Sequence, residues 1–259
     1  MAPSLSWIFV APVKGFALVP RDEVELGPKG IDDDRRFHLI GAEGRLLNGK
    51  QLAPLVQIVP EWVEDSGFLS LSFPTGEVVS GVIELGERVT TNFYGRRDVE
   101  GRLVEGPWSE AISTFVGRPL RLVQPVEPGD GRDRRDAAVS MLSTGSLEAL
   151  REAGNIEEPI DPRRFRMLFG VEGIEPHEED TWIGRRVRVG QAEVEVRGNV
   201  GRCIVTSRNP ETGARTIPTL DILAEYRHGV ETTEPLPFGV WGQVTERGRV
   251  RLGDDIVPG

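Results

Sequence analysis

The chain contains a single cysteine, Cys203, which follows Arg202 directly and lies six residues after Arg197. One cysteine excludes an internal disulfide, so any role of this thiol must be that of a free thiol. Two nearby guanidinium groups would favour the thiolate, and a thiolate is the soft ligand that metals such as molybdenum accept. A buried, inert core thiol remains an equally permitted interpretation of the same pattern.

The arginines are clustered, although the formal net charge of the 259-residue chain is −10. This acidic balance argues against a nucleic-acid partner, because phosphate backbones require a basic excess. Local anion sites remain possible at each cluster, and a solvated protein face is the alternative. The clusters are Arg96–Arg97, Arg132–Arg135, Arg163–Arg166 and Arg185–Arg186.

Other candidate groups are weaker. The segment Ser143–Ser146 joins a predicted strand to a predicted helix, where free N–H groups suit an oxyanion, although ordinary capping explains it too. Three histidines are far apart and give no zinc-site spacing. We expect the acidic segment 175–180 to lie at the surface. The chain lacks the signature motifs of serine hydrolases, zinc proteases and nucleotide-binding loops. The histidines are His38, His177 and His228.

These residues must be positioned by a mainly β framework, because strand patterns separated by Gly- and Asp-rich turns dominate the first third of the chain. This arrangement favours a small barrel or sandwich. Helices are predicted over 108–116, 147–153 and 220–226, the last capped by Thr219. Segment 124–136, rich in Pro, Gly and charge, is predicted to be a mobile or functional loop. The predicted strands include 7–10, 37–40, 55–59, 68–73, 139–142 and 203–206.

Three parts of the chain, in the same order, resemble one known family. Segments 11–15 and 34–37 resemble the N-terminal β-barrel found ahead of MOSC domains. Segment 201–206, followed by Asn-Pro-Glu-Thr-Gly at 209–213, is similar to the cysteine block of MOSC proteins related to the mitochondrial amidoxime-reducing component. Residues 238–254 resemble the closing segment of that family.

The resemblance implies a mainly β (α+β) fold, with an N-terminal small β-barrel lobe at 1–110 packed on a MOSC-type β-barrel lobe at 111–259 that carries a few short helices. It also implies a molybdenum cofactor (molybdopterin), with Cys203 as the metal ligand and catalytic residue. Basic side chains of the family hold the pterin and its phosphate. Transferred by motif, the cofactor-binding residues are Lys14, Gly15, Arg35, Ser143, Thr144, Arg166 and Arg202.

Two positions depart from the family pattern. Leu168 stands where the family's Phe-Arg-Pro-Asn motif has its asparagine, and Gly15 replaces the serine of the mammalian relatives. The amide contact that the family's asparagine makes is therefore absent, and an apolar side chain stands in its place.

The resemblance favours an oxidoreductase that reduces N-hydroxylated or related N- or S-oxygenated small molecules. The chain has no haem, flavin or iron–sulfur motif, so the electrons would come from an external donor protein. The alternatives are a persulfide carrier or transferase that uses Cys203, and a non-enzymatic carrier of the cofactor. The family is also associated with pyridoxal phosphate binding. No apolar run approaches bilayer length and no signal peptide is recognisable, so we expect a cytoplasmic protein without a membrane partner.

Overall fold

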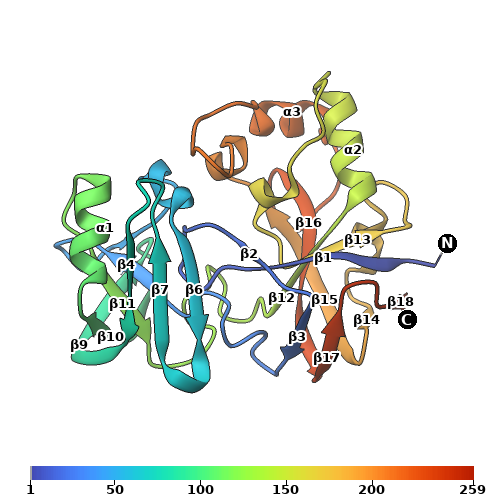
Figure 1. The fold of residues 1–259 in the computed structure, drawn as a ribbon. Helices are drawn as coiled ribbons and strands as arrows, with labels where there is room; N and C mark the ends of the chain where they lie inside the picture. The colour runs from blue at the N-terminus through green and yellow to red at the C-terminus, as the bar shows by residue number, and fades with distance from the viewer. Residues whose placement is uncertain (1) are drawn as a thin grey trace.

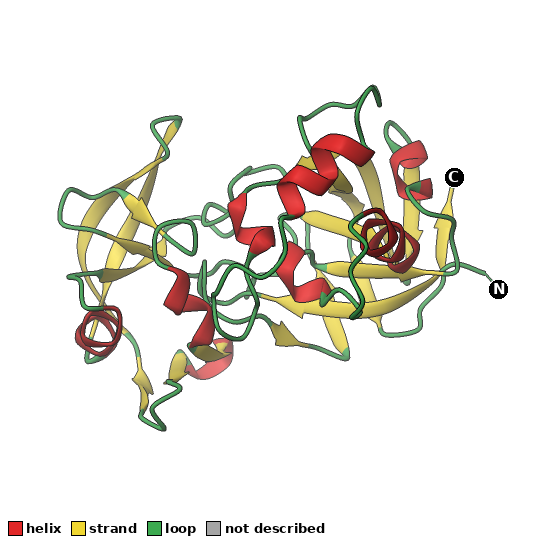
Figure 2. Ribbon diagram, turned by 90° about the horizontal axis from the view of Figure 1, so that it is seen from above, coloured by secondary structure: helices red, strands yellow, loops and turns green. Residues whose placement is uncertain are grey.

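The computed structural model describes residues 2–259, which form two β-rich lobes side by side (Figure 1). Figure 2, seen from above, shows strands in both lobes and most of the helical turns on or near the larger one. The mainly β fold expected from the sequence is confirmed.

The larger lobe is built on an eight-stranded sheet with the order β18-β14-β15-β16-β12-β13-β1-β2. Its neighbouring strands are antiparallel except β12 and β13, which run parallel. A two-stranded ribbon of β3 and β17 completes the lobe. The strands are β1 (Ser4–Val10), β2 (Val19–Pro20), β3 (Glu23–Leu26), β12 (Val139–Ser143), β13 (Phe169–Glu172), β14 (Arg186–Val189), β15 (Ala192–Gly201), β16 (Pro237–Glu246), β17 (Gly248–Arg251) and β18 (Ile256–Pro258).

The smaller lobe has a five-stranded sheet, β5-β4-β11-β10-β9, and a three-stranded sheet, β6-β7-β8. Helix α1 (Trp108–Val116) packs between them, and the indole N–H of Trp108 donates to Leu69 O at 3.2 Å. The strands are β4 (His38–Ile40), β5 (Leu46–Leu47), β6 (Val59–Val63), β7 (Phe68–Ser72), β8 (Val78–Val82), β9 (Glu84–Phe93), β10 (Arg97–Glu105) and β11 (Arg121–Pro125).

Each lobe has its own apolar core, since alternate residues of its strands face inward. In the larger lobe, α2 (Thr144–Ala153) and α3 (Thr219–Tyr226) cover a second apolar cluster that includes Leu150, Leu223 and Phe238. None of the helices within residues 2–259 combines the length and apolar character required to cross a bilayer.

The boundary between the lobes in space does not coincide with a single position in the sequence. Strands β1, β2 and β3 precede the smaller lobe in sequence but pair within the larger lobe. Strand β11 follows residue 110 but pairs with β4 and β10 in the smaller lobe. The division at residue 110 therefore remains a prediction about folding units. In space, both lobes contain residues from each side of it.

The helices at 108–116, 144–153 and 219–226 agree with the sequence-based expectation to within a few residues. Three local predictions were wrong. Segment 53–57 is a 3₁₀ helix with a proline in its first turn, whereas a strand was expected at 55–59. Cys203 precedes a 3₁₀ turn over Ile204–Ser207, because Thr206 donates both its N–H and its hydroxyl to Cys203 O. The Thr219 hydroxyl does not cap α3 but donates to Thr206 O.

Candidate functional site

A pocket of about 620 Å³ lies at the junction of the lobes and contains Cys203. Its wall combines the turn after β1, the β9–β10 hairpin, the loop between β11 and β12, the residues before β13 and the segment that follows β15. These elements are distant in sequence, so the pocket exists only when both lobes are assembled.

Lys14 lies on the turn that follows β1 and is held there by its own backbone N–H, which donates to Phe37 O at 2.8 Å. Its Nζ forms an ion pair with Asp133 Oδ1 at 2.8 Å, and its side chain is nearly buried. Burial lowers the pKa of Lys14; Asp133 opposes this shift, while Arg35 and Arg166 reinforce it. A lysine in this environment is stabilised by additional negative charge.

Arg35 adopts a positive φ of 57° and its backbone N–H donates to Ala11 O at 2.7 Å, which fixes it beside Lys14. Its guanidinium bonds to the buried carboxylate of Asp34 and to Arg166 O, the latter at 3.0 Å. Burial alone would raise the pKa of Asp34, but Arg35 and Arg132 lower it below its ordinary value. Asp34 therefore anchors two arginines as a permanent anion.

Arg166 and Arg202 reach the pocket from the larger lobe. Arg166 ends a 3₁₀ turn (Pro162–Phe165) with φ 55°, and its Nη1 donates to Phe16 O at 2.9 Å across the lobe boundary. Arg202 donates to Phe165 O at 3.0 Å and to Phe238 O at 2.8 Å. Burial is the main reason that the pKa falls to about 10 for Arg166 and about 9 for Arg202.

Cys203 is a free, half-buried cysteine two residues beyond the end of β15, directly after the half-buried Arg202. The backbone of this position is extended, and its carbonyl accepts from Thr206. The thiol therefore belongs to the pocket lining, among several arginines, where a cysteine can act as a nucleophile or a metal ligand.

The pocket is strongly cationic although the whole chain is acidic. Twelve lysines and arginines line it against three carboxylates, Asp34, Asp133 and Glu234. Such an excess in a concave site selects an anionic ligand. The cationic residues are Lys14, Arg35, Lys50, Arg96, Arg97, Arg132, Arg134, Arg163, Arg164, Arg166, Arg202 and Arg208.

Several guanidinium nitrogens of this wall are buried without a hydrogen-bond partner in the part of the chain that the structure describes. Buried donors without partners are costly, so their number at one cavity indicates a ligand with several acceptor oxygens. A group that carries a phosphate fits this donor set. The unpaired atoms are Nη2 of Arg166, Nε and Nη1 of Arg97, Nε and Nη1 of Arg164, and Nε of Arg208.

The expected convergence of Lys14, Arg35, Arg166 and Cys203 on one cleft is confirmed, and Arg202 joins them. Gly15 also lines the pocket, where its φ of 94° and the backbone N of Gly49, 3.1 Å from a hypothetical Cβ, suit glycine alone. The roles assigned to these residues from the family resemblance remain predictions.

Ser143 and Thr144 are not brought to this pocket. Ser143 is fully buried and its hydroxyl accepts from Ser146 N at 2.9 Å, the ordinary capping that the sequence left open. The space at the start of α2 is taken by the carboxylate of Glu179, whose Oε1 accepts from Ser143 N at 3.1 Å and from Ser146 Oγ at 2.7 Å. The helix start is thus supplied with an internal anion.

Glu179 was expected at the surface with the rest of segment 175–180, and this prediction was wrong, since the residue is fully buried. Burial raises its pKa, with the bonds from Ser146 and Ser143 opposing the shift. The acidic composition of the segment indicated an exposed position for all its residues, although the carboxylate of Glu179 faces inward.

We predict that Glu179→Ala lowers the free energy of unfolding by about 2 kcal/mol, because Ser143 N and Ser146 Oγ lose a buried acceptor. Glu179→Gln retains an amide oxygen at this position and removes the buried charge, so it should cost markedly less. Chemical denaturation of the two variants beside the wild type measures the difference. Equal losses for alanine and glutamine would contradict the capping role.

Sequence reasoning missed the contribution of the β9–β10 hairpin. Tyr94, at φ 59°, accepts from Asn48 Nδ2 at 2.6 Å, and the guanidinium of Arg97 lies 4.7 Å from the centre of the Phe93 ring. The Arg96–Arg97 pair was the available signal, but nothing local in the sequence showed that the hairpin folds over the pocket.

The loop after β11 contributes to the pocket wall. Arg132 is buried and donates to Ile31 O at 3.0 Å, and Asp133 accepts from Lys14. The expectation that segment 124–136 is a mobile or functional loop stays a prediction. Three of its charged residues, Arg132, Asp133 and Arg135, pair with the buried side chains of Asp34, Lys14 and Asp130.

Met167 and Leu168 form an apolar part of the wall, and both are almost completely buried. Met167 Sδ accepts from Arg202 Nη2 at 3.0 Å. Leu168 has no hydrogen-bonding group, whereas the asparagine of the family motif would offer an amide here. Polar contacts to a ligand in this part of the wall must therefore come from the surrounding arginines.

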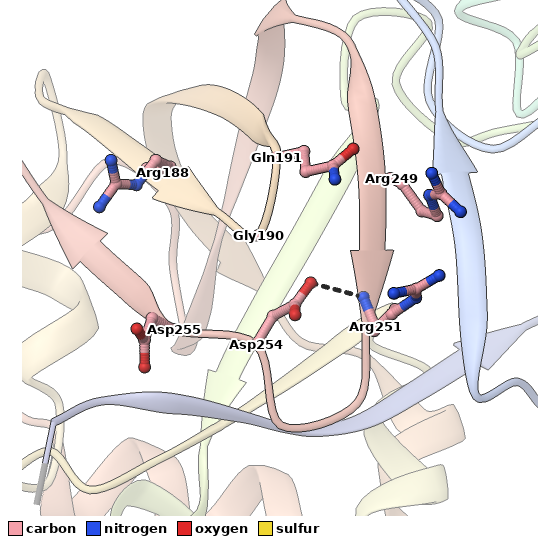
Figure 3. Close-up of a pocket in the computed structure, with 7 residues that line it drawn as sticks. All are labelled: Arg188, Gly190, Gln191, Arg249, Arg251, Asp254 and Asp255. Carbon is pink, nitrogen blue, oxygen red and sulfur yellow. Dashed lines mark hydrogen bonds between the residues drawn. The ribbon is translucent and has the colours of Figure 1, made fainter.

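A second, smaller pocket of about 320 Å³ lies near β14 and β17 in the larger lobe (Figure 3). Asp254 accepts there from the backbone N of Arg251, and Arg251 also pairs with Glu23 on β3. Three arginines face two aspartates in its lining, so the excess of positive charge is far smaller than in the first pocket. Its lining is Arg188, Gly190, Gln191, Arg249, Arg251, Asp254 and Asp255.

The histidines do not form a metal site. His38 is buried in β4 with Nε2 2.8 Å from Thr91 Oγ1, which agrees with the packed role expected for it. Within residues 2–259, no group of three or more His, Cys, Asp or Glu side chains is arranged to hold a metal ion. A metal at this protein would therefore depend on Cys203 together with ligand atoms from outside the chain.

Comparisons with known proteins give curated relatives of two kinds. The chain is 27% identical to "Mitochondrial amidoxime-reducing component 1" of Xenopus laevis over 97% of this chain and 81% of that protein. It is 26% identical to "Molybdenum cofactor sulfurase" of Danio rerio over 92% of this chain and 31% of that protein. The chain thus spans about a third of the sulfurase.

Among solved structures, the YUAD protein from Bacillus subtilis aligns over 100% of this chain and 96% of its own, with a TM-score of 0.47 and 12% identity. Family models match consecutive parts of the sequence: the MOSC N-terminal beta barrel domain at residues 2–116 and the MOSC domain at residues 115–257. The first match contains β1–β10 with α1, and the second contains β11–β17 with Cys203. The chain therefore belongs to the MOSC domain family.

Proposed function

We propose that this protein binds the molybdenum cofactor in the Cys203 pocket and reduces N-hydroxylated or related N- or S-oxygenated small molecules. The observation that carries the proposal is the convergence of a free cysteine, a buried lysine and several incompletely paired arginines on one cavity between the lobes. The relatives named for amidoxime reduction and for the molybdenum cofactor support the choice of ligand and reaction.

The residues divide into two roles. Cys203 would supply the protein ligand to the metal, because thiolate is a soft donor. Lys14, Arg35, Arg166 and Arg202 would hold the anionic pterin part by charge-assisted hydrogen bonds. Gly15 would shape the pocket wall, because its missing side chain lets the first turn pack against Gly49. When bound, the cofactor supplies two-electron redox chemistry that no side chain of this protein can provide.

The electrons would come from a separate donor protein. Because the proposed redox centre has no second redox group in this chain, the substrate and the donor must reach the pocket in turn or through different openings. The cytoplasmic location stays a prediction, and the first relative named above is a mitochondrial protein.

A second candidate function is sulfur transfer through a persulfide on Cys203. It is favoured by the several relatives named molybdenum cofactor sulfurase, of which this chain matches about a third. The same electropositive thiol would serve as the sulfur acceptor. Molybdenum with pterin in the purified protein favours the reductase, whereas cyanide-labile sulfur without metal favours the carrier. Cofactor without turnover from an artificial electron donor would indicate a non-enzymatic carrier.

We predict that Arg166→Met, in protein made in a cofactor-producing host, lowers the bound molybdenum and pterin by about tenfold or more. The change removes a half-buried cation whose buried Nη2 has no partner among residues 2–259, and one charge-assisted bond corresponds to about that factor in affinity. Elemental analysis and pterin fluorescence give the result without an activity assay.

Arg163→Met is the matched control, since this neighbouring guanidinium is already paired with Asp161 and Glu211. It should retain the wild-type cofactor content. Full loading of the Arg166 variant would contradict the assignment of the pocket.

A further inference from the structure

The pocket contains more free cationic groups than the residues already assigned to the pterin. Arg164 is 8% exposed and lines the pocket, yet its Nε and Nη1 have no partner among residues 2–259. Burial lowers the pKa of Arg164, with Asp161 opposing the shift. This arginine is distinct from Arg166, the residue matched to the family motif.

Arg164 is held in place by one bond, in which its Nη2 donates to Thr216 Oγ1 at 2.8 Å. Thr216 N in turn donates to Ser207 O at 3.0 Å, and Arg208 pairs with Arg215 in a short antiparallel bridge. The two guanidinium-bearing residues Arg164 and Arg208 therefore flank one piece of backbone.

Arg208 has the same character. It lines the pocket, its Nη1 donates to Gly213 O at 3.0 Å, and its buried Nε has no partner in the described chain. Neither Arg164 nor Arg208 forms an ion pair there, whereas Arg163 beside them pairs with both Asp161 and Glu211. Arg164 is buried and Arg208 half-buried, both line the same cavity, and neither is in an ion pair within residues 2–259, so their unpaired donors can take an external anion.

We propose that Arg164 and Arg208 form a second anion subsite in this pocket, which takes a carboxylate or phosphate group. The existence of the subsite does not depend on the function proposed above, but the identity of the molecule that carries the anionic group does. An anionic substituent of the substrate is one source, and the second phosphate of a nucleotide-bearing form of the cofactor is the other. The substrate or the cofactor would then carry an anionic group in addition to the pterin phosphate.

The subsite itself is tested without enzymatic turnover, by equilibrium dialysis of labelled inorganic phosphate against the cofactor-free full-length chain. We expect two phosphates per wild-type chain, one at the Lys14–Arg166 cluster and one at the subsite. Arg164→Met should bind one, because methionine keeps most of the volume and removes the donors. Arg163→Met should still bind two. Equal binding by the wild type and the Arg164 variant, or no binding by either, overturns the subsite.

The source is tested with the cofactor-loaded protein, an artificial electron donor and two amidoximes that differ only in a carboxylate at the end remote from the reacting nitrogen. For a substrate anion, Arg164→Met lowers kcat/KM for the carboxylate compound about tenfold and leaves the neutral compound unchanged. If the subsite binds a phosphate of the cofactor, acid hydrolysis of the variant should instead release less nucleotide per molybdenum than hydrolysis of the wild type.

A lost phosphate site without either of these changes would mean an adventitious ion only, and would overturn the ligand assignment. If neither amidoxime is reduced by the wild type, the proposed reductase function fails, while the dialysis experiment still decides the subsite.

Discussion

Cys203→Ser is expected to fold as the wild type does and to lose molybdenum-dependent turnover. The side chain is half-buried, and the bonds that shape its turn involve its carbonyl rather than its sulfur. Serine has nearly the same volume and is a good residue at the start of a helical turn, so the stability change should stay within about 1 kcal/mol.

The loss of activity follows from ligand chemistry. A hydroxyl has a much higher pKa than a thiol and is a poor ligand for a soft metal site. Lys14, Arg35 and Arg166 are unchanged by the substitution, so the pterin should still be held. We therefore expect that pterin is still detectable, that the molybdenum content is lower than in the wild type, and that the rate of amidoxime reduction falls by at least about 100-fold.

The measurements are pterin fluorescence, molybdenum content and amidoxime reduction for both proteins, with thermal melting as the control for folding. Equal turnover would exclude Cys203 as the metal ligand. A large decrease in melting temperature would instead support the interpretation of Cys203 as a core thiol.

Acidification should destabilise the smaller lobe through His38. This histidine is fully buried, and burial, with Lys14 and Arg97 nearby, lowers its pKa from 6.5 to about 3. The folded state thus holds a neutral imidazole, while the unfolded chain takes up a proton as the pH falls below 6.5. Stability is therefore present above the unfolded pKa and is lost progressively between pH 6.5 and about 3.

Between pH 7 and pH 4.5 this single group should remove about 2.5 kcal/mol of unfolding free energy. His38→Gln removes the titration and should flatten that part of the profile, although it lowers stability at pH 7 through poorer packing. Urea unfolding of both proteins at several pH values gives the comparison. Parallel profiles would show that His38 does not account for the acid sensitivity.

His38 also connects the core to the pocket. Its ring packs edge-on against Phe93 at 5.2 Å, and Phe93 carries Arg97 on its face. A protonated His38 would place a further cation beneath an already cationic wall. As the pH falls, the ligand-free protein should therefore lose stability while anion binding becomes stronger, because a bound anion favours the charged wall and stabilises the folded state.

The local elements could be predicted because their signals are local. The helix at 108–116 follows a proline and ends at a glycine, and the strand and helix around Ser143 show the expected change of period. The failure at Cys203 has a local cause too: its apolar successors suggested a strand, but Thr206 returns both donors to the Cys203 carbonyl.

The sequence by itself determined the β-rich class, the motifs that resemble the family and the candidate residues, because composition, periodicity and motif spacing are properties of neighbouring residues. Only the tertiary structure decided which candidates meet. Arg35 bonds to Arg166 O across 131 positions, and Glu179 fills the helix start that had been assigned to a ligand. Burial and charge pairing depend on partners that are distant in sequence, so the placement of Arg164, Arg208 and Asp133 in the pocket follows from the packing of the two lobes.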